Sequence, residues 1–140
     1  MSDMYQVMDM WGAWAAADNS GVDWSPIAAG FKGVIPHGKR SRIQCSDDDG
    51  IVIDGCVGRL KKYKPDEYEL VVAHFIFGVS LRALARRNKC SDGTIRKKMQ
   101  VALGFIEAVQ LLVSEGGGKA KNGLIVEYEF SGTSVRTLEI

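Results

Sequence analysis

The segment Phe77–Gln100 has the sequence FGVSLRALARRNKCSDGTIRKKMQ, which predicts two short helices joined by a tight turn. Ser80 is placed to cap the first helix and Ser91 the second, because a hydroxyl accepts hydrogen bonds from the free N–H groups of a first helical turn. Only Lys89 and Cys90 remain for the turn between them. The segment is therefore expected to form a helix-turn-helix within an all-α, compact helical bundle.

Apolar residues in this segment recur at the spacing that lets two crossing helices share a core. In the second helix they lie at i, i+4 and i+7, which places them on one face. The residues expected to point inward are Leu81, Leu84, Ala85, Cys90, Ile95, Met99 and Ala102.

Basic residues dominate the rest of the segment. Between residues 79 and 100 there are seven bases and one acid, a local excess of six on a chain whose formal net charge is +1. With Ile95 pointing inward, the opposite side of the second helix carries Gly93, Arg96, Lys97 and Gln100. This pattern favours contact with double-stranded DNA, and a solvated basic face on an ordinary helical hairpin is the alternative.

The expected DNA contacts are of two kinds. Ser80, Arg82 and Arg86 are expected to position phosphates, and Gly93 to let the backbone approach a groove closely. Asp92 either accepts from a cytosine amine or only stabilises the helix N-terminus. The residues expected to contact bases are Ser91, Asp92, Thr94, Arg96, Lys97 and Gln100, with Lys97 also suited to a phosphate.

Composition limits the classes of protein that remain. Of 140 residues, 46% are hydrophobic and 25% charged, which is ordinary for a globular domain. No apolar run is long enough to cross a membrane and the acidic N-terminus is unlike a signal peptide, so we expect a cytoplasmic protein. No catalytic Ser/His/Asp set, paired carboxylates or phosphate-binding loop is found, so the sequence does not predict an enzyme.

The cysteines give no sign of a metal site or a disulfide framework. Cys45, Cys56 and Cys90 are an odd number without a C-x-x-C pair, and neither histidine lies at metal-ligand spacing from them. The acidic run Asp47–Asp49 is an alternative cation site, although no second carboxylate cluster accompanies it. We therefore expect no metal and no cofactor.

Four further helices are expected before the helix-turn-helix, at about residues 3–18, 25–31, 48–63 and 65–77. Pro26 and Pro65 favour helix starts, because proline in the first turn loses no needed hydrogen bond. Asp47–Asp49 suit the positive end of the third helix. That helix is expected to bury Ile51, Val52, Cys56, Val57 and Leu60.

The second helix of the helix-turn-helix is expected to continue to about residue 113, before Gly116–Gly118. We therefore expect a helical body at residues 1–114, with the helix-turn-helix at about 80–104, and a Gly-rich linker and tail at 115–140. The alternating segment Leu124–Phe130 predicts a short β-hairpin in this tail, with an unstructured tail as the alternative.

Two resemblances rest on these motifs. Residues Phe75–Ile106 resemble region 4 of bacterial sigma factors, through GVS at 78–80, LA at 84–85 and SDGTIRKKM at 91–99. Lys89 departs from that pattern, which has glycine in a left-handed turn, and a lysine there costs roughly 1 kcal/mol. The resemblance therefore implies a helix-turn-helix whose turn is altered.

Residues 1–113 are also similar to the phage Q antitermination proteins of the lambdoid type. The matching pieces are WGAWAA at 11–16, DWSPIAAGFKGVIP at 23–36 and RSRIQCSDDDGIVIDGCVGRLKK at 40–62, followed by the helix-turn-helix. The tail beyond Glu115 departs from that family, and nothing is carried over to it.

This resemblance implies a function that spacing alone does not give. Such proteins, from bacteriophages or prophages, act in late gene expression in the bacterial host cytoplasm. They bind a DNA element at a late promoter, load onto paused RNA polymerase that still holds sigma, and let it pass terminators. The body is expected at the RNA exit channel, and more than one copy can bind the DNA. The alternative is a sigma-like regulator that acts only at initiation.

A second basic surface is expected away from the helix-turn-helix. Its lysines and arginines suit polymerase or nascent RNA of opposite charge, and solvated side chains are the alternative for each one singly. The residues are Lys39, Arg40, Arg42, Lys61 and Lys62.

Overall fold

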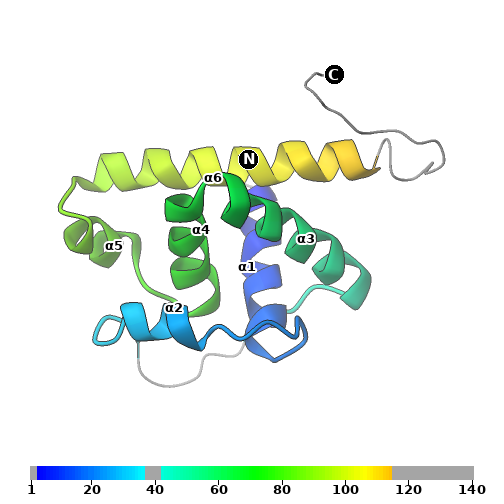
Figure 1. Ribbon diagram of the computed structural model, residues 1–140, viewed down its shortest axis with the longest axis horizontal. Helices are drawn as coiled ribbons and strands as arrows, with labels where there is room; N and C mark the ends of the chain where they lie inside the picture. The colour runs from blue at the N-terminus through cyan, green and yellow to red at the C-terminus, as the bar shows by residue number, and fades with distance from the viewer. Residues whose placement is uncertain (1–2, 37–41, 115–140) are drawn as a thin grey trace. The chain divides into compact units, whose positions relative to one another are not determined.

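Residues 3–36 and 42–114 are described by the structure, a computed structural model (Figure 1). Every regular element in these two ranges is a helix, which confirms the predicted all-α class. The elements are α1 (Asp3–Ala16), α2 (Ser25–Gly30), α3 (Asp47–Tyr63), α4 (Pro65–Val71), the π-helix η1 (Val72–Ile76), α5 (Leu81–Arg87) and α6 (Asp92–Leu112). The predicted hairpin in the tail and the triple glycine lie outside the described residues.

Packing divides the chain into two compact units, Met1–Ile106 and Glu107–Ile140. Ile106 is also the last buried residue of α6.

Helix α1 is the centre of the first unit and packs against both α3 and η1. Trp11 and Trp14 of α1 are buried, and each indole N–H donates to a carboxylate of α3. The acceptors are Asp54, at 3.2 Å, and Asp47, at 2.9 Å. These bonds satisfy the polar atom of each large ring, so α1 and α3 bury aromatic area without leaving an indole N–H unpaired.

Two glycines allow this close packing. A Cβ on Gly12 of α1 would lie 1.9 Å from the carbonyl oxygen of Phe75, and a Cβ on Gly50 of α3 would lie 2.3 Å from the ring of Trp14. Real Cβ atoms do not approach other atoms this closely. The helix backbones therefore touch their neighbours where a side chain would separate them.

The predicted inward face of α3 is partly wrong. Ile51 and Val52 are 64% and 40% exposed, whereas Ile53, which was not predicted to be buried, is 1% exposed. Gly50 decides which face of α3 is buried, because only a residue without a side chain fits against the Trp14 ring. The residues three and seven positions after Gly50, Ile53 and Val57, lie on the same face of the helix and are buried with it. The buried residues of α3 are Gly50, Ile53, Cys56, Val57 and Leu60.

The segment predicted as one helix at about residues 65–77 begins at Pro65 as expected but changes type at Val72. In η1 the turns widen, so that Phe77 N–H donates to the Val72 carbonyl at 3.3 Å. Gly78, with φ of +76°, then ends the element in a left-handed conformation. The end of the helical segment at about residue 77 was predicted, and the π-helix was not.

No helix among the described residues is both long and apolar enough to span a membrane. Within the same ranges, no group of histidine, cysteine and acidic residues is arranged to hold a metal ion, and the three cysteines are free thiols.

Candidate nucleic-acid interface

Both helices of the helix-turn-helix begin with the serine caps that the sequence predicts. The Ser80 hydroxyl accepts from the Ala83 N–H at 3.1 Å, and the Ser91 hydroxyl accepts from the Thr94 N–H at 3.1 Å. Each cap satisfies one of the N–H groups that a helix start leaves without an intrahelical partner. The starts of α5 and α6 are therefore fixed by short-range bonds.

The turn between α5 and α6 has the conformation typical of this motif despite its lysine. Lys89 adopts φ of +56°, in the left-handed region. Cys90 N–H donates to the Ala85 carbonyl at 3.0 Å, which closes the end of α5 around the turn. The expectation that lysine alters the turn is wrong, because the left-handed conformation costs only about 1 kcal/mol and the flanking bonds hold it.

The residues predicted to point inward in the two helices are buried or half-buried. Leu84, Ala85, Ile95, Met99 and Ala102 are all buried, and Leu81 and Cys90 are half-buried. Leu84, Ile95 and Ala102 have no exposed surface at all. The apolar periodicity of this segment therefore predicted its packing correctly.

The outer face of α6 is open to solvent in the pattern that the helical spacing predicts. A Cβ on Gly93 would have only the Ser91 hydroxyl within 4 Å, at 3.9 Å, so backbone is accessible there. We call the exposed residues of the motif that the sequence assigns to DNA contact the α5–α6 face. They are Ser80, Arg82, Arg86, Ser91, Asp92, Gly93, Thr94, Arg96, Lys97 and Gln100.

Internal hydrogen bonds limit what two of these residues offer a ligand. The Ser91 hydroxyl donates to Thr94 Oγ1 at 3.0 Å while accepting from the Thr94 N–H. Ser80 Oγ is likewise engaged as a cap. Arg96, Lys97 and Gln100 have no hydrogen bond or ion pair to another side chain within the described ranges, so their polar groups are available to a partner.

The second predicted surface divides into three parts. Lys39 and Arg40 lie outside the described residues. Lys61 and Lys62 are exposed at the end of α3, with their ammonium groups 5.7 Å and 5.5 Å from the ring centroids of Tyr68 and Tyr63. Tyr63 is itself 64% exposed, so this end of α3 presents both charge and an aromatic ring.

Arg42, the third part, is not on the surface. Its side chain is 15% exposed and its guanidinium binds the Phe75 carbonyl at 2.7 Å, the Ile76 carbonyl at 3.4 Å and Asp9 at 3.2 Å. A guanidinium held by three internal acceptors is not free for an external partner. The expected role as a polymerase or RNA contact is therefore replaced by a role inside the fold.

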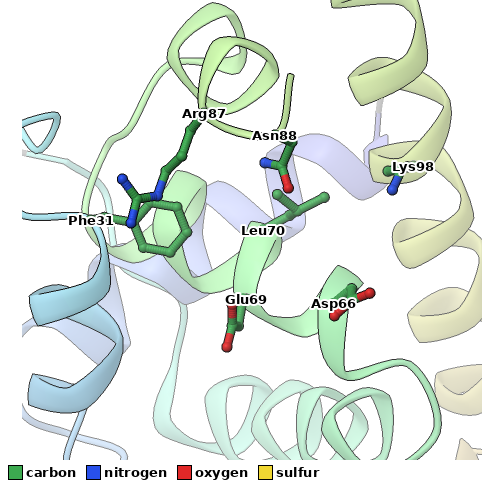
Figure 2. Close-up of a pocket in the computed structure, with 7 residues that line it drawn as sticks. All are labelled: Phe31, Asp66, Glu69, Leu70, Arg87, Asn88 and Lys98. Atoms are coloured by element: carbon green, nitrogen blue, oxygen red, sulfur yellow. The ribbon is translucent and has the colours of Figure 1, made fainter. Parts of the chain in front are cut away.

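A pocket of about 380 Å³ lies beside the motif (Figure 2). Figure 2 shows Arg87 beside Phe31, with its guanidinium 4.9 Å from the ring centroid, and Arg87 also donates to the Gly30 carbonyl. Asp66, Glu69 and Lys98 bring charges of both signs to the wall. Arg87 therefore connects α5 to α2 rather than joining the α5–α6 face.

His74 of η1 connects the motif to α1. Its Nδ1 is 2.7 Å from the Val79 carbonyl, one residue before the Ser80 cap, and its Nε2 bonds the Tyr5 hydroxyl. Burial lowers the pKa of His74, which keeps the ring neutral near neutral pH. A neutral ring that donates from Nδ1 and accepts at Nε2 satisfies both partners, so His74 is a structural residue.

The sequence profile of phage antitermination protein Q matches residues 1–115. The chain belongs to this family. Its function is therefore transcription antitermination, and the prediction that it is not an enzyme is confirmed by the family.

Two relatives support this assignment over most of the chain. The antitermination protein Q of Escherichia phage 933W is 43% identical over 132 residues, 94% of this chain and 90% of that protein. The prophage antitermination protein Q homolog QuuD of Escherichia coli K12 is 47% identical over 109 residues, 78% of this chain and 86% of that protein. The first alignment extends past Glu115, so part of the tail has a counterpart in a relative, contrary to the expectation that it departs from the family.

The fold is also similar to that of a solved antitermination protein. Transcription antitermination factor Q21 matches with a TM-score of 0.64 at 18% identity, over 84% of this chain and 91% of that one. The same protein in complex with its binding-element DNA matches with a TM-score of 0.63 at 17% identity. At these identities the likeness is one of fold.

Proposed function

We propose that this Q-family protein binds a duplex DNA element through the α5–α6 face and then acts on RNA polymerase. Arg82 and Arg86 contact phosphates, and α6 enters the major groove with Arg96 and Gln100 toward base edges. Lys97 contacts a phosphate, and Gly93 allows the helix to approach the groove closely. Ser80 and Ser91 contribute as caps that present backbone N–H groups to phosphates.

One observation carries this proposal: the side of α6 opposite buried Ile95 is exposed and bears an arginine, a lysine and a glutamine without internal partners in the described ranges. Long basic side chains left free on the second helix of a helix-turn-helix suit a phosphate-lined groove. The solved complex of factor Q21 with its binding-element DNA supports this use of the fold.

The second step of the proposed function is loading onto polymerase. At a late promoter the protein joins paused polymerase that still holds sigma, travels with it and prevents termination. The exposed end of α3, with Lys61, Lys62 and Tyr63, is the described surface best suited to polymerase or nascent RNA, because it joins positive charge to an exposed aromatic ring. Lys39 and Arg40 belong to the same proposal by charge alone.

A transcription assay tests the whole proposal. Purified polymerase, sigma and the protein are combined on a template with the upstream element and two successive terminators. We expect readthrough of both terminators to rise only when the element is present. The variant Arg96→Ala should lose this effect, whereas Lys98→Ala, which removes a charge from the pocket side of α6, should keep it.

The assay also distinguishes the alternative, a regulator of initiation alone. In that case the amount of transcript rises or falls while the fraction that passes each terminator stays constant. Readthrough that does not depend on the element would reject DNA binding as the loading step.

A further inference from the structure

The guanidinium of Arg42 lies at the C-terminal end of η1, a few residues before the helix-turn-helix begins. It donates from Nη1 to the Phe75 carbonyl and from Nη2 to the Ile76 carbonyl, at 2.7 Å and 3.4 Å. Asp9 of α1 holds the same guanidinium at 3.2 Å. The end of η1 is thus fixed by a side chain that lies 33 residues earlier in the sequence.

Only a few residues separate this site from the first helix of the motif. Val79 has no exposed surface, its N–H donates to the Ala73 carbonyl at 3.0 Å, and its carbonyl is bound by His74. Ser80 follows directly and caps α5. The path from the guanidinium to the start of α5 therefore runs through hydrogen-bonded backbone, with Gly78 as its one left-handed residue.

We propose that Arg42 is a positioning residue for the DNA interface. By holding the Phe75 and Ile76 carbonyls it fixes the direction in which the chain leaves η1, and so the place of the N-terminus of α5 relative to α1. The inference rests on the proposed DNA contact of the α5–α6 face. It adds a residue that touches no DNA but sets how well α5 reaches the phosphates.

The forked shape of arginine is central to this role. Two N–H groups of one planar guanidinium reach neighbouring carbonyls while a third bond holds Asp9, and the single ammonium of lysine does not reproduce that fork. At 15% exposure the charge of Arg42 is too enclosed to contact a phosphate itself. Arg42→Lys therefore removes the fork and keeps the charge, whereas Arg42→Met removes both.

The test compares Arg42→Lys, Arg42→Met and Ile53→Val in the full chain. The third variant removes one methylene group from the buried face of α3 and serves as the destabilised control. Each is titrated with element DNA at several salt concentrations, at a temperature where circular dichroism shows it folded. We expect both Arg42 variants to bind the element at least about tenfold more weakly than the wild type. The slope of log K against log salt should become less steep by roughly one, as for one lost phosphate contact. The control should keep the wild-type slope.

Two results would overturn the inference. If Arg42→Lys binds the element DNA with the affinity and salt slope of the wild type, a positive charge at this position is sufficient and the guanidinium fork is not required. If the folded Arg42 variants and the control all keep the wild-type slope, Arg42 serves stability alone.

A second measurement separates this inference from the proposed function. Hydrogen exchange at the Val79 and Ala83 amides reports the connection to α5 without DNA, because these N–H groups donate to the Ala73 carbonyl and to Ser80 Oγ. We expect about tenfold faster exchange in both Arg42 variants than in Ile53→Val. If the wild-type protein binds no DNA, the proposed function fails, and unchanged exchange at these two amides would still reject the positioning role by itself.

Discussion

Arg96 and Arg42 place the same side chain in opposite surroundings. On the α5–α6 face, Arg96 is exposed and has no internal partner among the described residues, whereas at the contact of α1 with η1 Arg42 is enclosed and binds three internal acceptors. In the proposed function the first region is completed by DNA, whereas the guanidinium in the second region has its acceptors within the protein. Substitutions in the second region should therefore change stability, and at Arg42 also the placement of α5, whereas substitutions on the α5–α6 face should change binding alone.

The strongest challenge to this comparison is Gly12→Ala at the contact of α1 with η1. The added Cβ would lie 1.9 Å from the Phe75 carbonyl oxygen, so the two backbones must separate. We expect the free energy of unfolding to fall by about 3 kcal/mol, the upper range for overpacking. Chemical denaturation followed by circular dichroism measures this change.

Gly55→Ala is the matched control for that substitution. The new Cβ would have nothing within 4 Å, and alanine favours a helix interior over glycine. This variant should be more stable by roughly 0.5–1 kcal/mol. Equal effects of the two variants would contradict the close approach of α1 and η1.

Arg96→Ala should leave stability unchanged and weaken binding to the element. If Arg96 forms two hydrogen bonds to a guanine, its loss costs about 1–3 kcal/mol on the matching sequence and less on others. Competition binding with single-base variants of the element measures the difference. An equal loss on every sequence would assign Arg96 to phosphates instead.

Lys97→Ala should weaken binding to all sequences alike and reduce the salt slope by roughly one, as expected for one phosphate contact. Lys98→Ala is the control, because Lys98 lies one residue further along and lines the pocket beside the motif. Salt titrations of DNA binding by both variants show which of these two neighbouring lysines contacts a phosphate. A Lys97→Ala slope equal to that of the wild type would remove Lys97 from the phosphate contacts.

A small effect on stability is expected at Lys89. Replacement by glycine removes the cost of a side chain at φ of +56°, and should raise the free energy of unfolding by about 1 kcal/mol. Lys89→Ala keeps that cost and should change stability little. A Lys89→Gly variant no more stable than the wild type would show that the turn is not strained.

Local patterns predicted the helix-turn-helix well. Ser80 and Ser91 each accept from an N–H three residues further along the chain. The burial of Ile95, Met99 and Ala102 follows from their spacing on one face of a helix. The exposed side of α6 follows from the same spacing, because a helix with one face buried has its opposite face in solvent.

Contacts between distant segments could not be predicted in this way. The face of α3 depends on Gly50 meeting Trp14, and the wide turns of η1 accompany the approach of Gly12 to the Phe75 carbonyl. Arg42 looked like part of a basic loop because its sequence neighbours are basic, while its acceptors lie in α1 and η1. Charge in a sequence does not distinguish an external contact from an internal one.

All three tryptophans of the chain lie at positions 11, 14 and 24, and Trp11 and Trp24 are in edge-to-face contact with ring centroids 6.1 Å apart. The α5–α6 face carries no indole. Intrinsic fluorescence should therefore shift to the red when the N-terminal helices lose their packing and stay constant when nucleic acid is added. Tryptophan fluorescence can then follow denaturation with and without bound duplex. The increase in the free energy of unfolding when duplex is present gives the binding free energy, so unfolding and binding can both be measured on an unlabelled sample.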